Sequence, residues 1–155
     1  MKKYHYTECG LKNIYLVNGF KITKNKSGEK EIFIHDIHGL HRTIGMLLVS
    51  KHGPLSGNEI KFIRTTLDLS QKTLARILGL NYQSVLLWEK NKSTISKTAD
   101  HLLRALFFAY LNTKKSKAIY DKINEIADFD AATAANSNMG KIELEEVSDE
   151  WRMVA

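Results

Sequence analysis

The chain has 155 residues, of which 43% are hydrophobic, and it contains one cysteine. This length suits one domain with an appendage, and no apolar run of about 18 residues is present, so we expect no membrane span. The single cysteine excludes an intramolecular disulfide, and the N-terminus MKKYHYTEC lacks the apolar core of a signal peptide, so we expect a cytoplasmic protein.

The formal net charge of +6 is unevenly distributed along the chain. Residues 1–57 hold nine Lys or Arg and four Asp or Glu, and residues 58–92 and 93–127 each hold six and three. Residues 128–155 hold only two basic residues but seven acidic ones. A basic body with an acidic tail suits a polyanionic partner, although ordinary solubilising charge gives the same balance.

Two segments near the N-terminus, 13–22 and 29–36, are rich in β-branched and aromatic residues. A turn signal over residues 24–28 lies between them, so we predict a β-hairpin. Alternation assigns the side chains of the second strand to two faces, with Ile32 and Ile34 on one and Phe33 and His35 on the other.

Cys9 and the histidines at positions 5, 35, 38 and 41 raise the question of a metal site. Structural zinc is usually held by paired ligands such as C-x-x-C, and Cys9 has no second cysteine, so we expect no metal and no cofactor. A Cys–His protease site lacks an acidic partner and an oxyanion site. No phosphate-binding glycine loop or catalytic constellation is present, so we do not expect an enzyme.

Residues 40–51 predict a helix, which His52-Gly53-Pro54 ends. Its apolar positions at helical spacing are Leu40, Ile44, Leu47 and Leu48. The next helix begins at Ser56 and turns three apolar residues inward, namely Ile60, Ile63 and Leu67.

Residues 56–92 carry three helix starts of the same kind. The N-caps are Ser56, Ser70 and Asn81, each preceded by a leucine and followed four positions later by an apolar residue, which is the spacing of a hydrophobic staple. Ser56 also fits a capping box with Glu59. Gly79 stands at the end of the second helix, and only two residues separate it from a third helix over 82–90. Two short helices joined by a tight glycine-containing turn predict a helix-turn-helix. The two helices are expected to share one apolar face, formed by Leu74, Ala75, Leu78, Val85 and Trp88.

The segment LSQKTLARILGLNYQSVLLWEKNK resembles the Xre/Cro-type helix-turn-helix of phage repressors and bacterial regulators. The matching residues are Leu69-Ser70-Gln71, Leu74-Ala75, Leu78-Gly79, Gln83-Ser84-Val85 and Trp88-Glu89. The resemblance implies a mainly α fold with a small β element, in which a five-helix, lambda-repressor-like bundle carries the N-terminal hairpin. Asn91 stands where the family usually has glycine, and asparagine also tolerates a left-handed conformation.

A longer stretch, from YHYTECGLKNIYLVNGF through HDIHGLHRTIG to the helix-turn-helix, resembles MqsA-type (YgiT-type) antitoxins. Members of that family join an N-terminal zinc-binding β element to an Xre domain. The Cys9-Gly10 context matches, but the other zinc cysteines are absent. The resemblance implies a toxin protein as an alternative partner to DNA.

The C-terminal third predicts two more helices, over 98–112 and about 114–127. The first has a broader apolar side than one face needs, which suits either a cap on the core or a dimer seam, and the second turns Ile119, Ile123 and Ile126 inward. Residues 130–140 are typical of a linker, and the end of the chain forms either a second hairpin, which extends the N-terminal sheet, or an acidic tail. We thus divide the chain into a hairpin plus helix (1–50), a helix-turn-helix domain (51–128), and a linker with hairpin or tail (129–155).

The second helix of a helix-turn-helix enters the DNA major groove with its N-terminal end first. We therefore predict base contacts from Tyr82, Gln83 and Leu87, in which Gln83 pairs with adenine and Leu87 touches a thymine methyl group. The predicted contacts to the DNA backbone come from Gln71, Lys72, Ser84, Lys90, Asn91 and Lys92. The resemblance implies that Gln71 binds a phosphate and also supports the second helix of the motif.

Two functions follow from these patterns. The first is a transcriptional repressor that binds a palindromic operator of double-stranded DNA as a homodimer. The alternative is the antitoxin of a type II toxin–antitoxin pair, which binds a toxin protein and regulates its own promoter.

Overall fold

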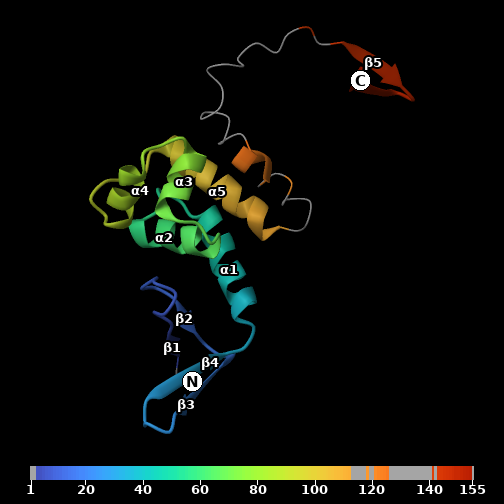
Figure 1. Ribbon diagram of the computed structural model, residues 1–155. Coiled ribbons are helices and arrows are strands. Elements are labelled where there is room, and N and C mark those ends of the chain that lie inside the picture. The colour runs from blue at the N-terminus through green and yellow to red at the C-terminus, as the bar shows by residue number, and fades with distance from the viewer. Residues whose placement is uncertain (1–2, 113–117, 119–120, 126–140, 142, 155) are drawn as a thin grey trace.

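A computed structural model of the protein describes residues 3–112, 118, 121–125, 141 and 143–154 (Figure 1). The helices are α1 (Ile37–Ser50), α2 (Gly57–Thr66), α3 (Gln71–Leu78), α4 (Tyr82–Glu89) and α5 (Lys97–Leu111), and residues 121–125 are also helical. The strands form three two-stranded antiparallel sheets: β1 (Tyr4–His5) with β2 (Tyr15–Leu16), β3 (Phe20–Lys24) with β4 (Lys30–Ile34), and β5 (Leu144–Val147) with β6 (Glu150–Met153). The expected combination of helices with small β elements is confirmed, while an Xre-like arrangement of the helices stays a prediction.

The segment 13–22, predicted as one strand, contains two strands. Tyr15 and Leu16 pair with β1, whereas the chain from Phe20 onward pairs with β4. The break falls at Gly19, whose φ of 76° lies in the left-handed region that glycine adopts without a steric penalty. The prediction of one continuous strand is therefore wrong at this glycine.

The β3–β4 hairpin has the predicted alternation. Ile32 and Ile34 are half-buried, whereas Phe33 lies on the opposite face and is 65% exposed. Phe20 packs against Tyr4 of β1, with ring centroids 5.4 Å apart. One face of the hairpin therefore lies against the rest of the N-terminal segment, while the other is open to solvent.

Helix α1 begins three residues before the predicted start at Leu40, because Asp36 caps it and accepts a hydrogen bond from the Gly39 N–H at 3.1 Å. Ile44 and Leu48 are buried and Leu40 is half-buried, as their spacing predicts. Leu47, in contrast, is mostly exposed. Gly45 faces α5, and two residues further along a helix correspond to about 200° of rotation, so Leu47 lies away from the core.

The three predicted helix starts are confirmed. Ser56, Ser70 and Asn81 are the N-caps of α2, α3 and α4, and each side chain accepts a hydrogen bond from a backbone N–H of the first turn. Ser56 and Glu59 make both hydrogen bonds of a capping box, and Gly79 ends α3 with a φ of 69°. Because such a cap contributes about 1 kcal/mol, local interactions define where each of these helices begins.

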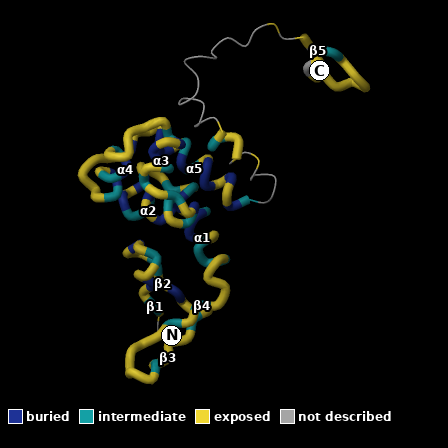
Figure 2. Tube along the Cα trace, in the orientation of Figure 1, coloured by how far each residue is buried: buried dark blue, intermediate teal, exposed yellow. Residues whose placement is uncertain are grey.

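The helices enclose an apolar core, which Figure 2 shows as the buried part of the trace. The side chains most fully removed from solvent are Phe107, Ile60, Ile63, Leu74, Leu103, Leu106 and Val85. Burial of one such side chain contributes about 1.5–3 kcal/mol. Helix α1 reaches this core closely, since a Cβ atom at Gly45 would lie 2.6 Å from the Phe107 ring. The predicted domain boundary after residue 50 stays a prediction. Helix α1, before this boundary, packs against α5, after it.

Arg104 of α5 connects the end of α1 with the start of α2. Its guanidinium donates to the carbonyl oxygens of Lys51 and Gly53, each at 2.5 Å, and forms a 2.6 Å ion pair with Asp100. Asp100 is buried and accepts a hydrogen bond from the Leu55 N–H at 2.8 Å. Arg104 Nη1 also donates to the carbonyl oxygens of Leu48 and Val49 in the last turn of α1, each at 3.3 Å. The last carbonyl groups of a helix have no partner within it, so Arg104 supplies partners that the α1 sequence lacks.

Helix α5 lies within one residue of the predicted range 98–112. Phe107 and Leu111 face the core while Phe108 and Tyr110 remain about half exposed, so the broad apolar side is present. Of the predicted helix 114–127, residues 121–125 are helical and Ile123 packs against the core. The predictions for Ile119, Ile126 and the linker 130–140 concern residues outside those that the structure describes.

The predicted C-terminal hairpin is present as β5 and β6. The two central residues of its turn, Ser148 and Asp149, both have positive φ, as in a type I′ turn that joins adjacent antiparallel strands. Within the described part of the chain, these strands pair with each other and not with β1–β4. The predicted extension of the N-terminal sheet is therefore not observed.

Candidate nucleic-acid interface

Helices α3 and α4 are joined by three residues, Gly79, Leu80 and Asn81. The Leu80 N–H donates to the Ala75 carbonyl at 2.8 Å and closes the turn. The predicted shared apolar face is confirmed, since its members are buried or, for Leu78, half-buried: Leu74, Ala75, Leu78, Val85 and Trp88. Two short helices thus pack on each other across a tight turn.

At the C-terminal end of α4, the carboxylate of Glu89 accepts three side-chain hydrogen bonds. Arg64 of α2 donates from Nε at 2.5 Å and from Nη2 at 3.1 Å, and Gln71 of α3 donates from Nε2 at 2.9 Å. Arg64 also donates to the Leu69 carbonyl between α2 and α3 at 2.9 Å. The cluster of Arg64, Gln71 and Glu89 holds α4 against both neighbouring helices and neutralises Glu89.

The residues after α4 contact the first turn of α2. Asn91 has a φ of 55°, which confirms the left-handed conformation expected there, and its Oδ1 accepts from the Gly57 N–H at 3.0 Å. A Cβ atom at position 57 would overlap the carbonyl oxygens of Trp88 and Glu89. Sequence reasoning missed this close approach. Its signal is a glycine directly after an N-cap, since glycine is a poor helix former and its presence there suggests a steric requirement.

The N-terminal half of α4 faces solvent. The three residues predicted to contact bases are all exposed: Tyr82, Gln83 and Leu87. Of the two adjacent leucines, Leu86 is half-buried and Leu87 points outward. Ser84 is half-buried, and its N–H donates to the Asn81 carbonyl at 3.0 Å, so it forms part of the first turn of α4.

Lysine side chains flank this surface. Lys72 lies in the first turn of α3, and its Nζ is 5.5 Å from the centroid of the Tyr82 ring, within the range of a cation–π contact. Lys90 and Lys92, which follow α4, are exposed. The exposed surface of α4 is therefore bordered by cations from both helices.

Two of the predicted backbone contacts are engaged within the protein. The Gln71 amide binds Glu89, and the Asn91 amide oxygen binds Gly57. The expectation that Gln71 supports the second helix agrees with this geometry, whereas its contact with phosphate stays a prediction. Sequence reasoning missed Arg64, because residues 64 and 89 meet only in the folded chain.

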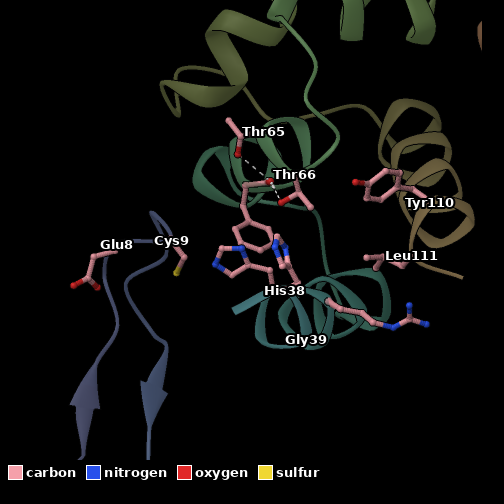
Figure 3. A pocket seen from close by; sticks show the side chains of 11 residues that line it. Glu8, Cys9, His38, Gly39, Thr65, Thr66, Tyr110 and Leu111 are labelled. Atoms are coloured by element: carbon pink, nitrogen blue, oxygen red, sulfur yellow. Dashed lines mark hydrogen bonds between the residues drawn. The ribbon is translucent and has the colours of Figure 1, made fainter. Parts of the chain in front are cut away.

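A second feature is a cleft of about 680 Å³ between the β1–β2 loop and the helices (Figure 3). Figure 3 shows Cys9 from that loop, His38 from α1 and Tyr110 from α5 around it. The Cys9 thiol donates weakly to the Tyr6 carbonyl at 3.5 Å. Within the part of the chain that the structure describes, no three His, Cys, Asp or Glu side chains lie close enough together to hold a metal.

His41 lies beside this cleft and joins the β1–β2 segment to α1 and α2. Its Nε2 is 2.8 Å from the Tyr6 hydroxyl, and its ring meets the Phe62 ring edge-on. Burial, and secondarily the neighbouring His38, hold the pKa of His41 below its ordinary value. Burial also raises the pKa of Tyr6. The contact therefore favours a neutral His41.

No family model matches the sequence, and no curated protein or solved structure matches it either. No helix in the described ranges combines the length and the apolar character needed to cross a membrane. The case for a function therefore depends on the geometry of α3 and α4.

Proposed function

We propose that the chain is a sequence-specific DNA-binding repressor, and not an enzyme, that acts as a homodimer. Helix α4 enters the major groove of a palindromic operator with its N-terminal end. The observation that carries this proposal is the contrast between the two ends of α4. Tyr82 and Gln83 are exposed at the start, whereas Glu89 at the end is held by Arg64 and Gln71.

Each exposed residue of α4 has a chemical counterpart on a base edge. The Gln83 amide matches the N6 and N7 groups of adenine, and a bidentate pair of this kind discriminates by about 1–3 kcal/mol. The Leu87 side chain suits a thymine methyl group, and the Tyr82 hydroxyl suits a base or a phosphate. These three side chains would read sequence.

The surrounding residues would position the protein on the DNA backbone. Lys72, Lys90 and Lys92 are exposed cations on either side of α4 and would approach phosphates. Gln71, Ser84 and Asn91 also belong to the proposed contact surface for the DNA backbone. Gln71 and Asn91 would act through their hydrogen bonds to Glu89 and Gly57, which fix α4. A motif of this size makes few base contacts, so a dimer on half-sites about 34–36 Å apart completes the proposal.

Selection of random duplex DNA on the full-length protein tests the proposal, followed by affinity measurements for the enriched site. We expect Gln83→Ala to lose about 1–3 kcal/mol of discrimination at one base pair. Lys90→Ala is the matched control. Loss of its phosphate contact should weaken binding to all sequences equally and reduce the slope of log K against log salt concentration by about 1. Unchanged discrimination in Gln83→Ala would refute the assignment of α4 as the reading helix.

The antitoxin function remains a second candidate because of the N-terminal strands. These strands expose several large apolar side chains, namely Tyr15, Val17, Ile22 and Phe33, of which Ile22 and Phe33 lie on opposite faces of the β3–β4 hairpin. Grouped exposed apolar residues mark protein-binding surfaces more often than DNA-binding ones. Co-purification of the chain with the product of a neighbouring toxin-like gene, and loss of that co-purification in Phe33→Asp, would support the antitoxin function. Selection of a specific DNA site without any such partner would favour the repressor function.

A further inference from the structure

The two outer hairpins have opposite charge. The β3–β4 hairpin, residues 20–34, contains four lysines and two glutamates, so its net charge is +2. The C-terminal hairpin, residues 143–154, contains five acidic residues and one arginine, so its net charge is −4. Two-stranded hairpins are marginally stable in water without a partner surface. Each hairpin would therefore gain stability from a partner surface, and their opposite net charges favour contact between them.

The basic hairpin has a slot on the face opposite Phe33. The slot has a volume of about 300 Å³ between β1 and the β3–β4 hairpin, and its apolar lining consists of Tyr4, Phe20, Ile22 and Ile32. Ile22 remains 50% exposed there. Lys3 and Lys30 line the slot, as do Glu8 and Glu31, and Glu8 accepts a hydrogen bond from the Tyr4 hydroxyl. The slot combines an apolar floor with two lysines that form no ion pair within the described residues.

The acidic hairpin carries one large side chain without a cover. Trp151 is 70% exposed, and it pairs across the strands with Glu146. Glu145 is neutralised by Arg152 at 2.7 Å. Glu146 and Glu150 have no cationic partner among the residues that the structure describes. Because cross-strand partners share a face and successive residues alternate, Glu146 lies on the same face as Trp151 and Glu150 lies on the other. An exposed tryptophan with a free carboxylate beside it is therefore the main feature of this hairpin.

We propose that the C-terminal hairpin of one copy docks on the β3–β4 hairpin of a second copy. Trp151 enters the slot, whose apolar floor suits an indole ring, and Glu146, on the same face, approaches Lys3 and Lys30 of the other copy. Among the residues that the structure describes, the hairpin pairs with none of the N-terminal strands of its own chain, and Figure 1 draws it on the opposite side of the helices from β3–β4. Reciprocal exchange of two hairpins gives a closed, symmetric dimer with two identical contacts.

This inference builds on the proposed homodimer and names its contact surface. Sedimentation of the full-length protein without DNA, over a range of concentrations at low and high salt, tests it independently of DNA binding. We expect a dimer that weakens at high salt, because the contact includes solvent-exposed charges. Trp151 fluorescence should move to shorter wavelength as the dimer forms, since Trp88 is already buried in the monomer.

Trp151→Ala is expected to raise the dimer dissociation constant by at least about tenfold, as expected for a central aromatic anchor. Phe33→Ala is the matched control: Phe33 is similarly exposed but lies on the opposite face of β4, so the dissociation constant should be unchanged. A wild-type protein that stays monomeric, or a dimer that Trp151→Ala leaves unchanged, would overturn the proposal while leaving DNA reading by α4 intact.

A charge exchange distinguishes docking between copies from docking within one chain. One variant carries Glu146→Lys, and the other carries Lys3→Glu and Lys30→Glu. Each alone brings like charges together and should be monomeric, whereas a mixture of the two restores opposite charges at both contacts and should form a heterodimer. If mixing restores nothing and Trp151 is shielded in the wild-type monomer, the hairpin docks within its own chain and the inference is wrong.

Discussion

The helical body (α1–α5, residues 37–111) and the two outer hairpins (β3–β4 and β5–β6) bury their apolar residues to very different extents. In the body, Ile63, Leu74 and Phe107 are completely buried, and even the ion pair between Arg64 and Glu89 is almost closed to solvent. In the hairpins, Phe33 and Trp151 are largely exposed, and the ion pair between Arg152 and Glu145 is open to water. Figure 2 shows the same contrast along the trace.

This difference indicates that the two regions have different roles. The body has the contacts to fold and to hold α4 at a fixed angle, whereas the hairpins keep apolar and charged groups available for a partner. The body is therefore expected to control stability and the orientation of α4, on which the proposed DNA reading depends. The hairpins are expected to control association with other molecules.

Truncation of a core aromatic residue gives the largest expected effect. We expect Trp88→Ala to lower the free energy of unfolding by about 3–5 kcal/mol, because Trp88 is buried in the apolar core. Phe33→Ala, at an exposed hairpin position, should change it by less than about 0.5 kcal/mol. Urea unfolding of both variants measures the difference, and equal losses would remove the distinction between the two regions.

The two ion pairs provide the next comparison. Glu89→Ala should cost about 3 kcal/mol of stability, because it leaves the Arg64 guanidinium nearly buried without a partner. Glu145→Ala removes the equivalent pair from the C-terminal hairpin and should cost less than about 1 kcal/mol. Thermal unfolding of the two variants provides the check. A similar cost at both sites would mean that the Glu89 cluster contributes little to holding α4.

Gly57→Ala probes the junction between α2 and α4 with a single methyl group. The added Cβ meets backbone carbonyls that cannot rotate away, so we expect a loss of about 1–3 kcal/mol. The control is Thr98→Ala, an exposed position in the first turn of α5, which should change stability by less than about 0.5 kcal/mol. Stability equal to wild type in Gly57→Ala would show that the two helices can separate freely.

Protonation of His41 gives the smallest expected effect. Its pKa is lowered in the folded protein from the ordinary 6.5, so the unfolded chain binds the proton more tightly. Its contribution to stability is therefore complete above about pH 7 and is lost as the pH falls from 6.5 through the lower folded value. Urea unfolding at neutral and mildly acidic pH should show a larger acid loss for wild type than for His41→Gln. Parallel losses in the two proteins would assign the acid sensitivity elsewhere.

The sequence predicts well what local interactions decide. The caps Ser56, Ser70 and Asn81, and the stop at Gly79, involve residues a few positions apart, so their patterns are visible without a structure. The binding of Glu89 by Arg64 joins residues 25 positions apart, and no spacing rule reveals it. The exposure of Leu47 likewise depends on where α5 lies. The outward positions of Tyr82, Gln83 and Leu87 were predictable, because the helical period and the start of α4 are both local.

The position of Arg104 has a consequence for the order of folding. The carbonyl groups that it satisfies belong to residues 51 and 53, about 50 positions earlier in the chain. While the protein is being synthesised, α1 through α4 emerge before Arg104 does, so the end of α1 waits for α5. Such a contact forms late, because it closes a long loop. We expect chains that stop before α5 to remain incompletely folded, and α3 and α4 to acquire their fixed geometry only when α5 packs.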